Sequence, residues 1–281
     1  AFPLMTLPYV TRILSPDSIG HVYFYLNILS YITLLTALGI PLYGVREIAK
    51  NRNDLEKCNH MALELLILHL ILTAVGYLLV FVLCVSAGKI REDIPLFAVL
   101  SISLFFTTIG VSWFFQAVED FRYITIRSLL VKILSLILLF SLVRSRDDVI
   151  WYGFVLVCGS VGNNLFNLFR LRKYLRRTDF KRELNPFKHV RPASKVFLLN
   201  LTVGIYTQLS VFLLGFLQSD AAVGYYTMAQ KIVSILNSIV LALTTVLLPR
   251  LSNFVGNRQL DDFKALGNKS LSFSLAISLP I

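Results

Sequence analysis

Long apolar stretches alternate with short polar ones along most of the chain. Eight runs of mainly apolar residues lie at approximately 20–44, 60–87, 94–118, 121–143, 149–170, 193–217, 222–248 and 263–281, with a shorter apolar stretch at 1–14. A helix needs about 20 apolar residues to cross roughly 30 Å of hydrocarbon. The pattern therefore predicts an all-α, polytopic membrane protein built as a helix bundle.

The two ends of this pattern differ from its middle. Residues 1–14 are too short to span a membrane and do not begin with Met, and the last run stops at Ile281 without a flanking charge. We therefore expect seven complete transmembrane helices between a truncated first helix and a truncated last one, about nine in all. The first stretch has neither the basic region nor the cleavage site of a secretory signal.

Composition narrows the class of protein further. Apolar residues make up 56% of the chain and charged residues 15%, against roughly 25% charged residues in soluble domains. An ordinary cytosolic enzyme, a disordered tail and a secreted disulfide scaffold are thereby excluded. The three cysteines, Cys58, Cys84 and Cys158, are widely spaced and form no metal-binding motif. We expect no metal and no cofactor.

The basic residues behind the net charge of +11 are unevenly distributed between two sets of loops. Those at 45–60, 119–122, 170–196 and 249–269 hold 19 of the 27 Lys and Arg, whereas those at 15–20, 88–93, 144–148 and 218–221 hold 4. Cytoplasmic loops carry the excess of basic residues, so the first set is predicted to be cytoplasmic. The basic stretch 170–195 lies between two spans, which favours a linker facing membrane lipid over a nucleic-acid site.

Two segments about 205 residues apart resemble each other. LSPDSIGHVYFY (14–25) aligns with LQSDAAVGYYTM (217–228) when one residue is inserted, which pairs Asp17 with Asp220 and Gly20 with Gly224. Pro41 and Pro249 mark the ends of the helices that follow. A repeat of six spans predicts two lobes related by an axis along the membrane normal. The expected organisation is a six-helix lobe at 1–170, a basic cytoplasmic linker at 171–195 and three helices of a second lobe at 196–281.

Three segments resemble a known family. PLMTLPYVTRILSPDSIGHVYFY (3–25), LGIPLYGVREIAKNR (38–52) and GYYTMAQKIVSI…LLPRLSN (224–253) are similar to the polysaccharide flippases of the O-antigen (Wzx) type. Their superfamily also contains the lipid II flippases and the MATE drug exporters. The resemblance implies a two-lobed, MATE-like fold of twelve to fourteen helices in the bacterial inner membrane. It further implies transport of a polyprenyl-pyrophosphate-linked oligosaccharide from the cytoplasmic to the periplasmic leaflet.

Four basic residues lie within or at the edge of the spans, where charges are costly and normally face a cavity or a partner. Lys231 shares one helix face with Thr227, Ser234 and Ser238, which indicates a cleft-lining stripe, although snorkelling or a helix contact would produce the same pattern. Lys132 lies near mid-membrane and is also predicted to face the cleft. Arg127, about 140° further round the same helix, is expected to snorkel.

Two further cations complete the predicted substrate site. Arg12 ends the first helix near the outer surface, where interfacial anchoring is the alternative; the resemblance implies a cation at this place and at Lys231. Arg46 and Glu47 mark the inner end of the next helix and are expected to pair with each other or with a neighbouring helix as an inner gate. The hypothesis is a cationic cleft formed by Arg12, Arg46, Lys132 and Lys231 that offsets the desolvation of a pyrophosphate.

The remaining candidates are acidic or neutral. Glu64 and His69 would exchange protons in a transport cycle coupled to H⁺ or Na⁺; the alternative is a Glu paired with Arg52 or Lys57 and a packed His. Two polar residues of the sixth helix, Asn163 and Asn167, are expected either to line the cleft for sugar hydroxyls or to form helix–helix hydrogen bonds.

These features predict a transporter and not an enzyme. The leading hypothesis is an alternating-access flippase for an O-antigen or capsule repeat unit, in contact with lipid and with polysaccharide biosynthesis proteins. The alternative is a MATE-like, cation-coupled exporter of small molecules, although such a protein should place acids in the cleft. A membrane-embedded polymerase or ligase would need a large outer loop, which the residues between these spans do not provide.

Overall fold

The computed structural model describes residues 2–51, 54–175 and 183–235, together with 264, 266–270 and 272. Its elements are α1 (Phe2–Ile13), α2 (Pro16–Ala37), α3 (Ile40–Lys50), α4 (Leu55–Ser86), α5 (Gly88–Arg91), α6 (Ile94–Ile109), α7 (Ser112–Ala117), α8 (Phe121–Leu142), α9 (Val149–Leu175), the 3₁₀ helix η1 (Pro186–His189) and α10 (Val190–Leu217). A further helical segment covers 220–235. The described residues contain no strand, and the all-α prediction is confirmed.

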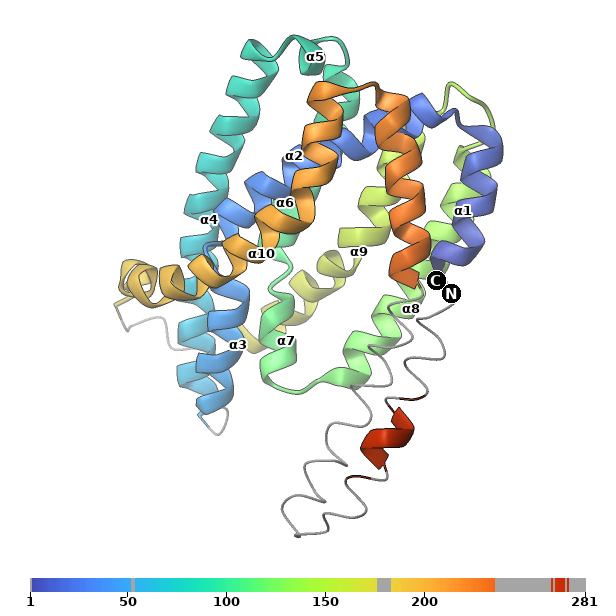
Figure 1. Ribbon diagram of the computed structural model, residues 1–281. Coiled ribbons are helices and arrows are strands. Elements are labelled where there is room, and N and C mark those ends of the chain that lie inside the picture. Colours follow the sequence, from blue (N-terminus) through green and yellow to red (C-terminus); the bar gives the residue numbers. More distant parts are fainter. Residues whose placement is uncertain are drawn as a thin grey trace.

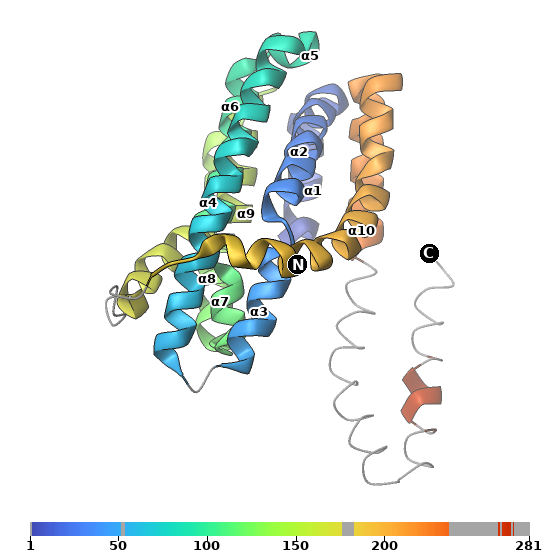
Figure 2. The ribbon, with the colours of Figure 1, turned by 90° about the vertical axis from the view of Figure 1, so that its left-hand side faces the viewer.

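Five of the described helical stretches are long and apolar enough to cross a membrane, and the bent pair Pro186–Leu198 and Leu201–Leu217 makes a sixth. The protein is thus a multi-pass membrane protein. The end of the bundle that carries α5 is here named the outer end, and the end toward which α3 and α7 extend the inner end, following the distribution of basic loops. Figure 1 shows the outer end at the top, and Figure 2 shows α2 lying between α4 and α10.

Side-chain caps fix where several helices begin. Ser15 accepts a hydrogen bond from the Ser18 amide before α2, Asp54 accepts one from Lys57 before α4, and Asp93 accepts one from Leu96 before α6. Each cap satisfies an amide that lacks a partner in the first turn of the helix. The caps at Ser15 and Asp93 lie in outer turns, and the cap at Asp54 lies in the inner turn before α4.

Two of the predicted spans are interrupted. The run at 20–44 breaks between α2 and α3, where Leu38 has φ 43° and Gly39 φ 72°, and the run at 94–118 breaks between α6 and α7, where Val111 has φ 41°. At the first break, a Cβ on Gly39 would lie 2.7 Å from the carbonyl oxygen of Ala193 in α10. The run at 20–44 is therefore not one continuous helix, because close backbone packing against α10 requires a residue without a side chain at Gly39. The run at 94–118 is confirmed as one span, Ile94–Ala117, with a local break at Val111.

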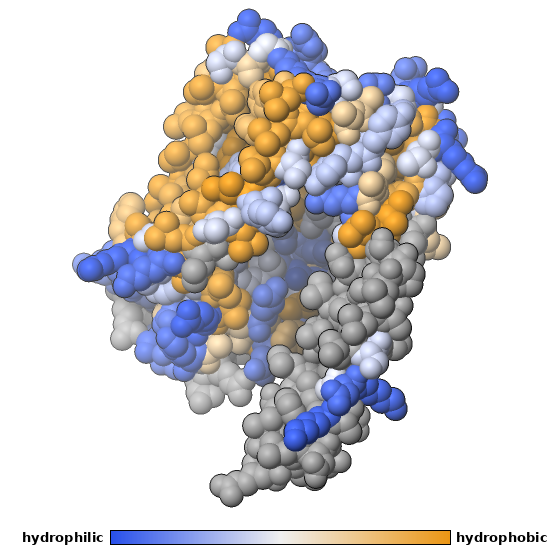
Figure 3. Space-filling view, viewed as in Figure 1, coloured by the Kyte–Doolittle hydropathy of each residue, from blue (hydrophilic) through white to orange (hydrophobic). Residues whose placement is uncertain are grey.

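The buried apolar residues form two separate cores. One lies toward the outer end and includes Phe24, Tyr25 and Phe97. The other lies toward the inner end and includes Trp113 and Phe114. Outside these cores, large apolar side chains are exposed along α4, α8 and α10, and Figure 3 shows an apolar surface with polar residues gathered beyond it at the top and at the lower left. Such a band is the surface that hydrocarbon would cover.

Candidate functional site

A polar cavity of about 400 Å³ lies between α2, α10 and the segment 220–235. It is named here the central cavity and is lined by Tyr23, Leu26, Asn27, Ser30, Gln208, Val211, Thr227, Gln230, Lys231 and Ser234. Lys231 lies eleven residues into its segment, or roughly 16 Å from the outer end at 1.5 Å per residue. The cavity therefore lies near the middle of a roughly 30 Å hydrocarbon layer.

Amide and cationic groups face one another across this cavity. The Asn27 side chain of α2 donates to the Gln208 side chain of α10 at 2.7 Å, and the Asn27 Oδ1 atom has no hydrogen-bond partner among the described residues. The Lys231 ammonium contacts the Tyr23 hydroxyl and lies 4.1 Å from the centre of its ring. Tyr23 in turn lies 3.2 Å, oxygen to oxygen, from Tyr152 of α9.

This set of groups favours a particular ligand chemistry. An ammonium group binds anions, and the amide and hydroxyl side chains of the lining form hydrogen bonds with hydroxyl groups. The central cavity is therefore suited to a polar ligand that combines negative charge with hydroxyl groups.

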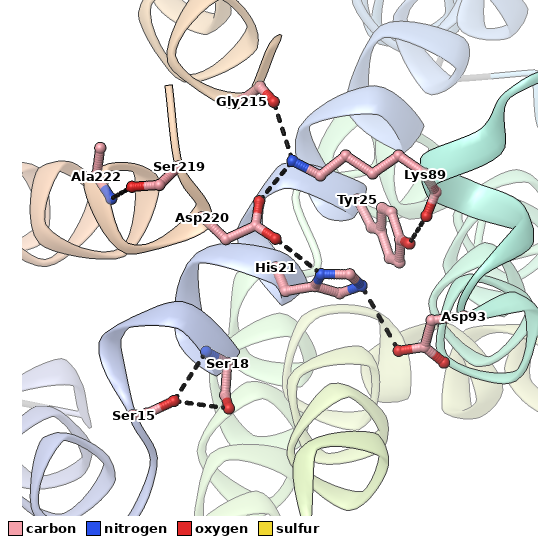
Figure 4. A network of polar contacts seen from close by, with 10 residues as sticks. All are labelled: Ser15, Ser18, His21, Tyr25, Lys89, Asp93, Gly215, Ser219, Asp220 and Ala222. Carbon is pink, nitrogen blue, oxygen red and sulfur yellow. Dashed lines mark hydrogen bonds and ion pairs between the residues drawn. The ribbon is translucent and has the colours of Figure 1, made fainter. Parts of the chain in front are cut away.

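A network of ionic contacts, named here the outer network, lies above the cavity at the outer end (Figure 4). The Asp220 carboxylate accepts hydrogen bonds from Lys89 of α5 at 2.6 Å and from His21 of α2 at 3.0 Å. His21 also lies 3.6 Å from Asp93, and Lys89 donates to the Gly215 carbonyl at 3.0 Å. Together these contacts tie 220–235 and α10 to α2, α5 and α6.

Backbone packing closes the same end. A Cβ on Gly20 would lie 1.7 Å from the Asp220 carbonyl oxygen, and one on Gly224 would lie 2.1 Å from the Pro16 carbonyl oxygen. The helices therefore cross at two residues that have no side chain, and these are the two glycines paired by the sequence repeat. Burial acts to raise the pKa of the Asp220 carboxyl, but hydrogen bonds from Lys89 and His21 outweigh it and lower the pKa below its ordinary value.

A second group of ionic contacts, the inner network, lies around Glu64 of α4. The Glu64 carboxylate accepts hydrogen bonds from the Asn185 amide at 2.9 Å, from Lys188 at 2.7 Å and from His189 at 2.9 Å. The other ring nitrogen of His189 lies 3.0 Å from the Tyr43 hydroxyl of α3. These contacts attach η1, at the end of the linker, to the inner parts of α3 and α4.

The structure brings together only some of the residues predicted from the sequence. Thr227, Lys231 and Ser234 line the central cavity, whereas Ser238 lies outside the described residues. Arg12, Arg46 and Lys132 lie on exposed faces of α1, α3 and α8, away from the cavity. Glu47 pairs with Lys50 at 2.6 Å rather than with Arg46.

The two basic residues of α8 differ from their predicted positions. The buried positions of this helix are Arg127, Val131, Ser135 and Leu139, spaced by four residues, so Lys132 falls on another face. Arg127 does not snorkel: it is 6% exposed and donates to the Asn163 carbonyl at 3.2 Å. Its guanidinium lies 5.2 Å from the Tyr123 ring centre.

The other candidates lie elsewhere in the first helices. Asn167 donates to the Gly110 carbonyl at the break between α6 and α7, at 2.6 Å, so it serves a helix–helix contact. Glu64 does not pair with Lys57: its ionic partners are Lys188, His189 and, at 3.7 Å, His60. Arg52 lies outside the described residues. His69 is buried, and neither of its ring nitrogens has a hydrogen-bond partner in the described part of the chain.

Several residues of these sites were missed in the sequence. Tyr23, Asn27 and Gln208 of the cavity were not singled out, although an Asn and a Gln within apolar spans are signals of a polar interior. The outer network also went unnoticed, since Lys89 and Asp93 stand in a short turn that reads as an ordinary charged loop. Their meeting with Asp220, more than 120 residues away, depends on tertiary structure.

Helices of membrane-spanning length around a polar interior cavity define a multi-pass helical membrane protein of the kind that moves polar molecules. A family model described as "Polysaccharide biosynthesis protein" matches residues 1–255, and the chain belongs to this family. The chain is 27% identical over 280 residues to a protein of Shigella dysenteriae named "Putative O-antigen transporter", covering 99% of this chain and 70% of that protein. A protein of Escherichia coli (strain K12) with the same name is 21% identical over 255 residues, which are 89% of this chain and 61% of that protein. No solved structure matches the chain.

Proposed function

We propose that the protein is a polysaccharide flippase that carries a polyprenyl-pyrophosphate-linked oligosaccharide, such as an O-antigen or capsule repeat unit, across the bacterial inner membrane. The observation that carries this proposal is the central cavity, which is lined by Lys231 and by the amides of Asn27 and Gln208. Family membership and the names of the two relatives support the same class of substrate.

The chemistry of the cavity fits such a head group. Lys231 offsets part of the cost of removing a pyrophosphate from water, and the amide and hydroxyl groups around it hydrogen-bond to sugar hydroxyls. The lipid tail stays in the membrane. Because the cavity holds a base and no described acid lines it, a MATE-like exporter of organic cations is not favoured, and neither relative's name refers to drugs.

Alternating access supplies the mechanism. The outer network and the Gly20–Gly224 crossing hold the outer end together, so the head group would enter the cavity from the cytoplasmic side. Rocking of a first lobe (1–170) against a second lobe (196–281) about the linker 171–195 would then part the outer contacts and release the head group. A transport role of this kind involves no enzymatic step, and coupling to H⁺ or Na⁺ and contacts with polysaccharide biosynthesis proteins belong to the same proposal.

The experiment replaces Lys231 with Gln in the full chain and measures surface polysaccharide in cells that depend on this protein. Loss of a charge-assisted hydrogen bond costs about 1.5–3 kcal/mol, so we expect display to fall about tenfold or more at equal protein level. Lys231→Arg should keep most of the display because it keeps the charge.

Lys132→Gln is the matched control, since it removes the same charge from an exposed face of α8. We expect its display to stay within about twofold of the wild type, which corresponds to less than about 0.5 kcal/mol. Full display by Lys231→Gln, or equal losses in the two variants, would contradict a cationic substrate site in the central cavity.

A further inference from the structure

A second cavity, of about 470 Å³, lies on the other side of the α2–α10 contact and is named here the lateral pocket. Its walls include Phe24, Ile28 and Leu35 of α2, Leu83 of α4, and Leu209 and Phe216 of α10. Apart from Lys89 at one end, the side chains that line it are apolar or aromatic. Its size is within the range of about 300–1,000 Å³ that is typical of small-ligand sites.

The lateral pocket is separate from the central cavity. Between the two, α2 and α10 pack through the Asn27–Gln208 hydrogen bond at 2.7 Å and through Phe24 and Phe216, whose ring centres lie 5.3 Å apart. The two cavities share no lining residue. A molecule with its head group in the central cavity therefore does not occupy the lateral pocket while these helices are in contact.

The lateral pocket opens toward the surrounding membrane. Three of its wall residues, Leu35, Leu209 and Phe216, are 48%, 42% and 60% exposed on helices of membrane-spanning length. From Phe24 to Leu35 the pocket follows α2 for eleven residues, or roughly 16 Å, which is about half of the hydrocarbon thickness. A hydrocarbon chain from one leaflet has this length.

The polar end of the pocket indicates which leaflet and which head group. Lys89 lies in α5 at the outer end, with its ammonium 4.4 Å from the Phe24 ring centre. A lysine has three N–H donors, and Lys89 uses two of them for Asp220 and the Gly215 carbonyl. One donor therefore remains for an acceptor at the mouth of the pocket.

We propose that the lateral pocket binds one acyl chain of an anionic phospholipid from the outer leaflet, with the lipid phosphate on Lys89. The same ammonium then serves the phosphate and Asp220, so the bound lipid becomes part of the outer contact between α5 and 220–235. This proposal is independent of which polar molecule occupies the central cavity.

Native mass spectrometry of the purified full chain, after delipidation and addition of phosphatidylglycerol or phosphatidylcholine, tests the proposal. We expect the wild type to retain one phosphatidylglycerol with about tenfold preference over phosphatidylcholine, equivalent to about 1.4 kcal/mol. Lys89→Gln should abolish this preference. Arg91→Gln, which removes a charge from an exposed residue of the same short helix, should keep it.

A second variant tests the pocket without changing Lys89. Leu209→Trp places a larger side chain at a partly exposed wall position and should reduce retention of both lipids several-fold. Unchanged lipid retention in Lys89→Gln and Leu209→Trp would overturn the proposal, as would equal losses in Lys89→Gln and Arg91→Gln. Retention of an added polyprenyl phosphate with exclusion of phosphatidylglycerol would also overturn it and would assign the pocket to the lipid carrier.

Discussion

The outer and inner networks use the same three chemical groups in different surroundings. Each centres on a carboxylate that contacts a histidine and a lysine: Asp220 with His21 and Lys89 at the outer end, and Glu64 with Lys188 and His189 at the inner end. The Asp220 side chain is 22% exposed, whereas the Glu64 side chain is 1% exposed and also accepts a backbone amide.

This difference in exposure changes what each ion pair contributes when it separates. A partly exposed pair loses little when it separates, because water replaces its partners. A buried carboxylate that loses its partners pays the full cost of desolvation. The outer network therefore suits a contact that separates and re-forms, and the inner network suits a permanent attachment of η1 to α4.

Replacing Glu64 with Ala should have the largest effect. The change leaves the buried His189 and the Asn185 amide without their acceptor, and each buried donor left unsatisfied costs about 1–3 kcal/mol. We expect a marked fall in the thermal unfolding temperature of the purified protein and a low yield. Glu47→Ala, which removes a more exposed pair with Lys50, should change stability by less than about 0.5 kcal/mol. Similar stability of the two variants would show that the inner network stabilises the fold no more than the exposed Glu47–Lys50 pair does.

Replacing Asp220 with Asn should open the outer end without unfolding the protein. The change removes the charge that holds Lys89 and His21 and weakens closure by about 1–2 kcal/mol, which raises the open population about 5- to 30-fold. Distances measured by double electron–electron resonance between spin labels on the exposed positions Arg146 and Gln218 report this population. Asp17→Asn changes the exposed position that the repeat aligns with Asp220 and should leave the distances unchanged. An equal response of both variants would contradict the role of Asp220 in closing the outer end.

Acid should produce the smallest effect, and only at low pH. The pKa of Asp220 is lowered because hydrogen bonds from Lys89 and His21 outweigh burial. The carboxylate therefore stabilises closure above the ordinary aspartate pKa of about 3.9, and this contribution is lost as the pH falls through the lowered value. The Arg146–Gln218 distances should stay constant from about pH 7 to pH 5 and lengthen below about pH 4. Opening between pH 7 and pH 5 would contradict control of the outer contact by the Asp220 carboxylate.

The membrane-spanning helices could be predicted because they depend on local composition. The apolar runs at 60–87, 121–143 and 149–170 correspond closely to α4, α8 and α9. The breaks at Leu38–Gly39 and Val111 could not be predicted, because they depend on packing against distant helices. Asn167, which binds the Gly110 carbonyl at the second break, is 57 residues away in sequence.

Which face of a helix points inward was the least predictable property. On α8, apolar side chains occur on all sides because lipid and protein interior are equally apolar. The helical period correctly separates Arg127 from Lys132 but does not say which of the two is buried. The position of Lys231 was easier to predict, because the polar residues Thr227 and Ser234 mark one face of its helix.

The ionic partners of Glu64 and Asp220 could not be predicted from the sequence either. Glu64 finds Lys188 and His189 more than 120 residues later, although Lys57 is only two turns away on the same helix. Neighbouring charges along a helix are suggested by spacing, whereas contacts between helices are set by how the bundle folds. Polar contacts that join distant segments, including the outer network, become visible only in three dimensions.

The two separately packed cores have a mechanical consequence. The outer core and the inner core meet where α2 gives way to α3 and where α6 gives way to α7, and both junctions contain residues with positive φ. Bending at these junctions would change a few backbone angles while leaving the side chains of each core in place. In the described residues, the parts of α2 and α6 in the outer core and α3 and α7 in the inner core would then move as two units, with the change confined to the two junctions.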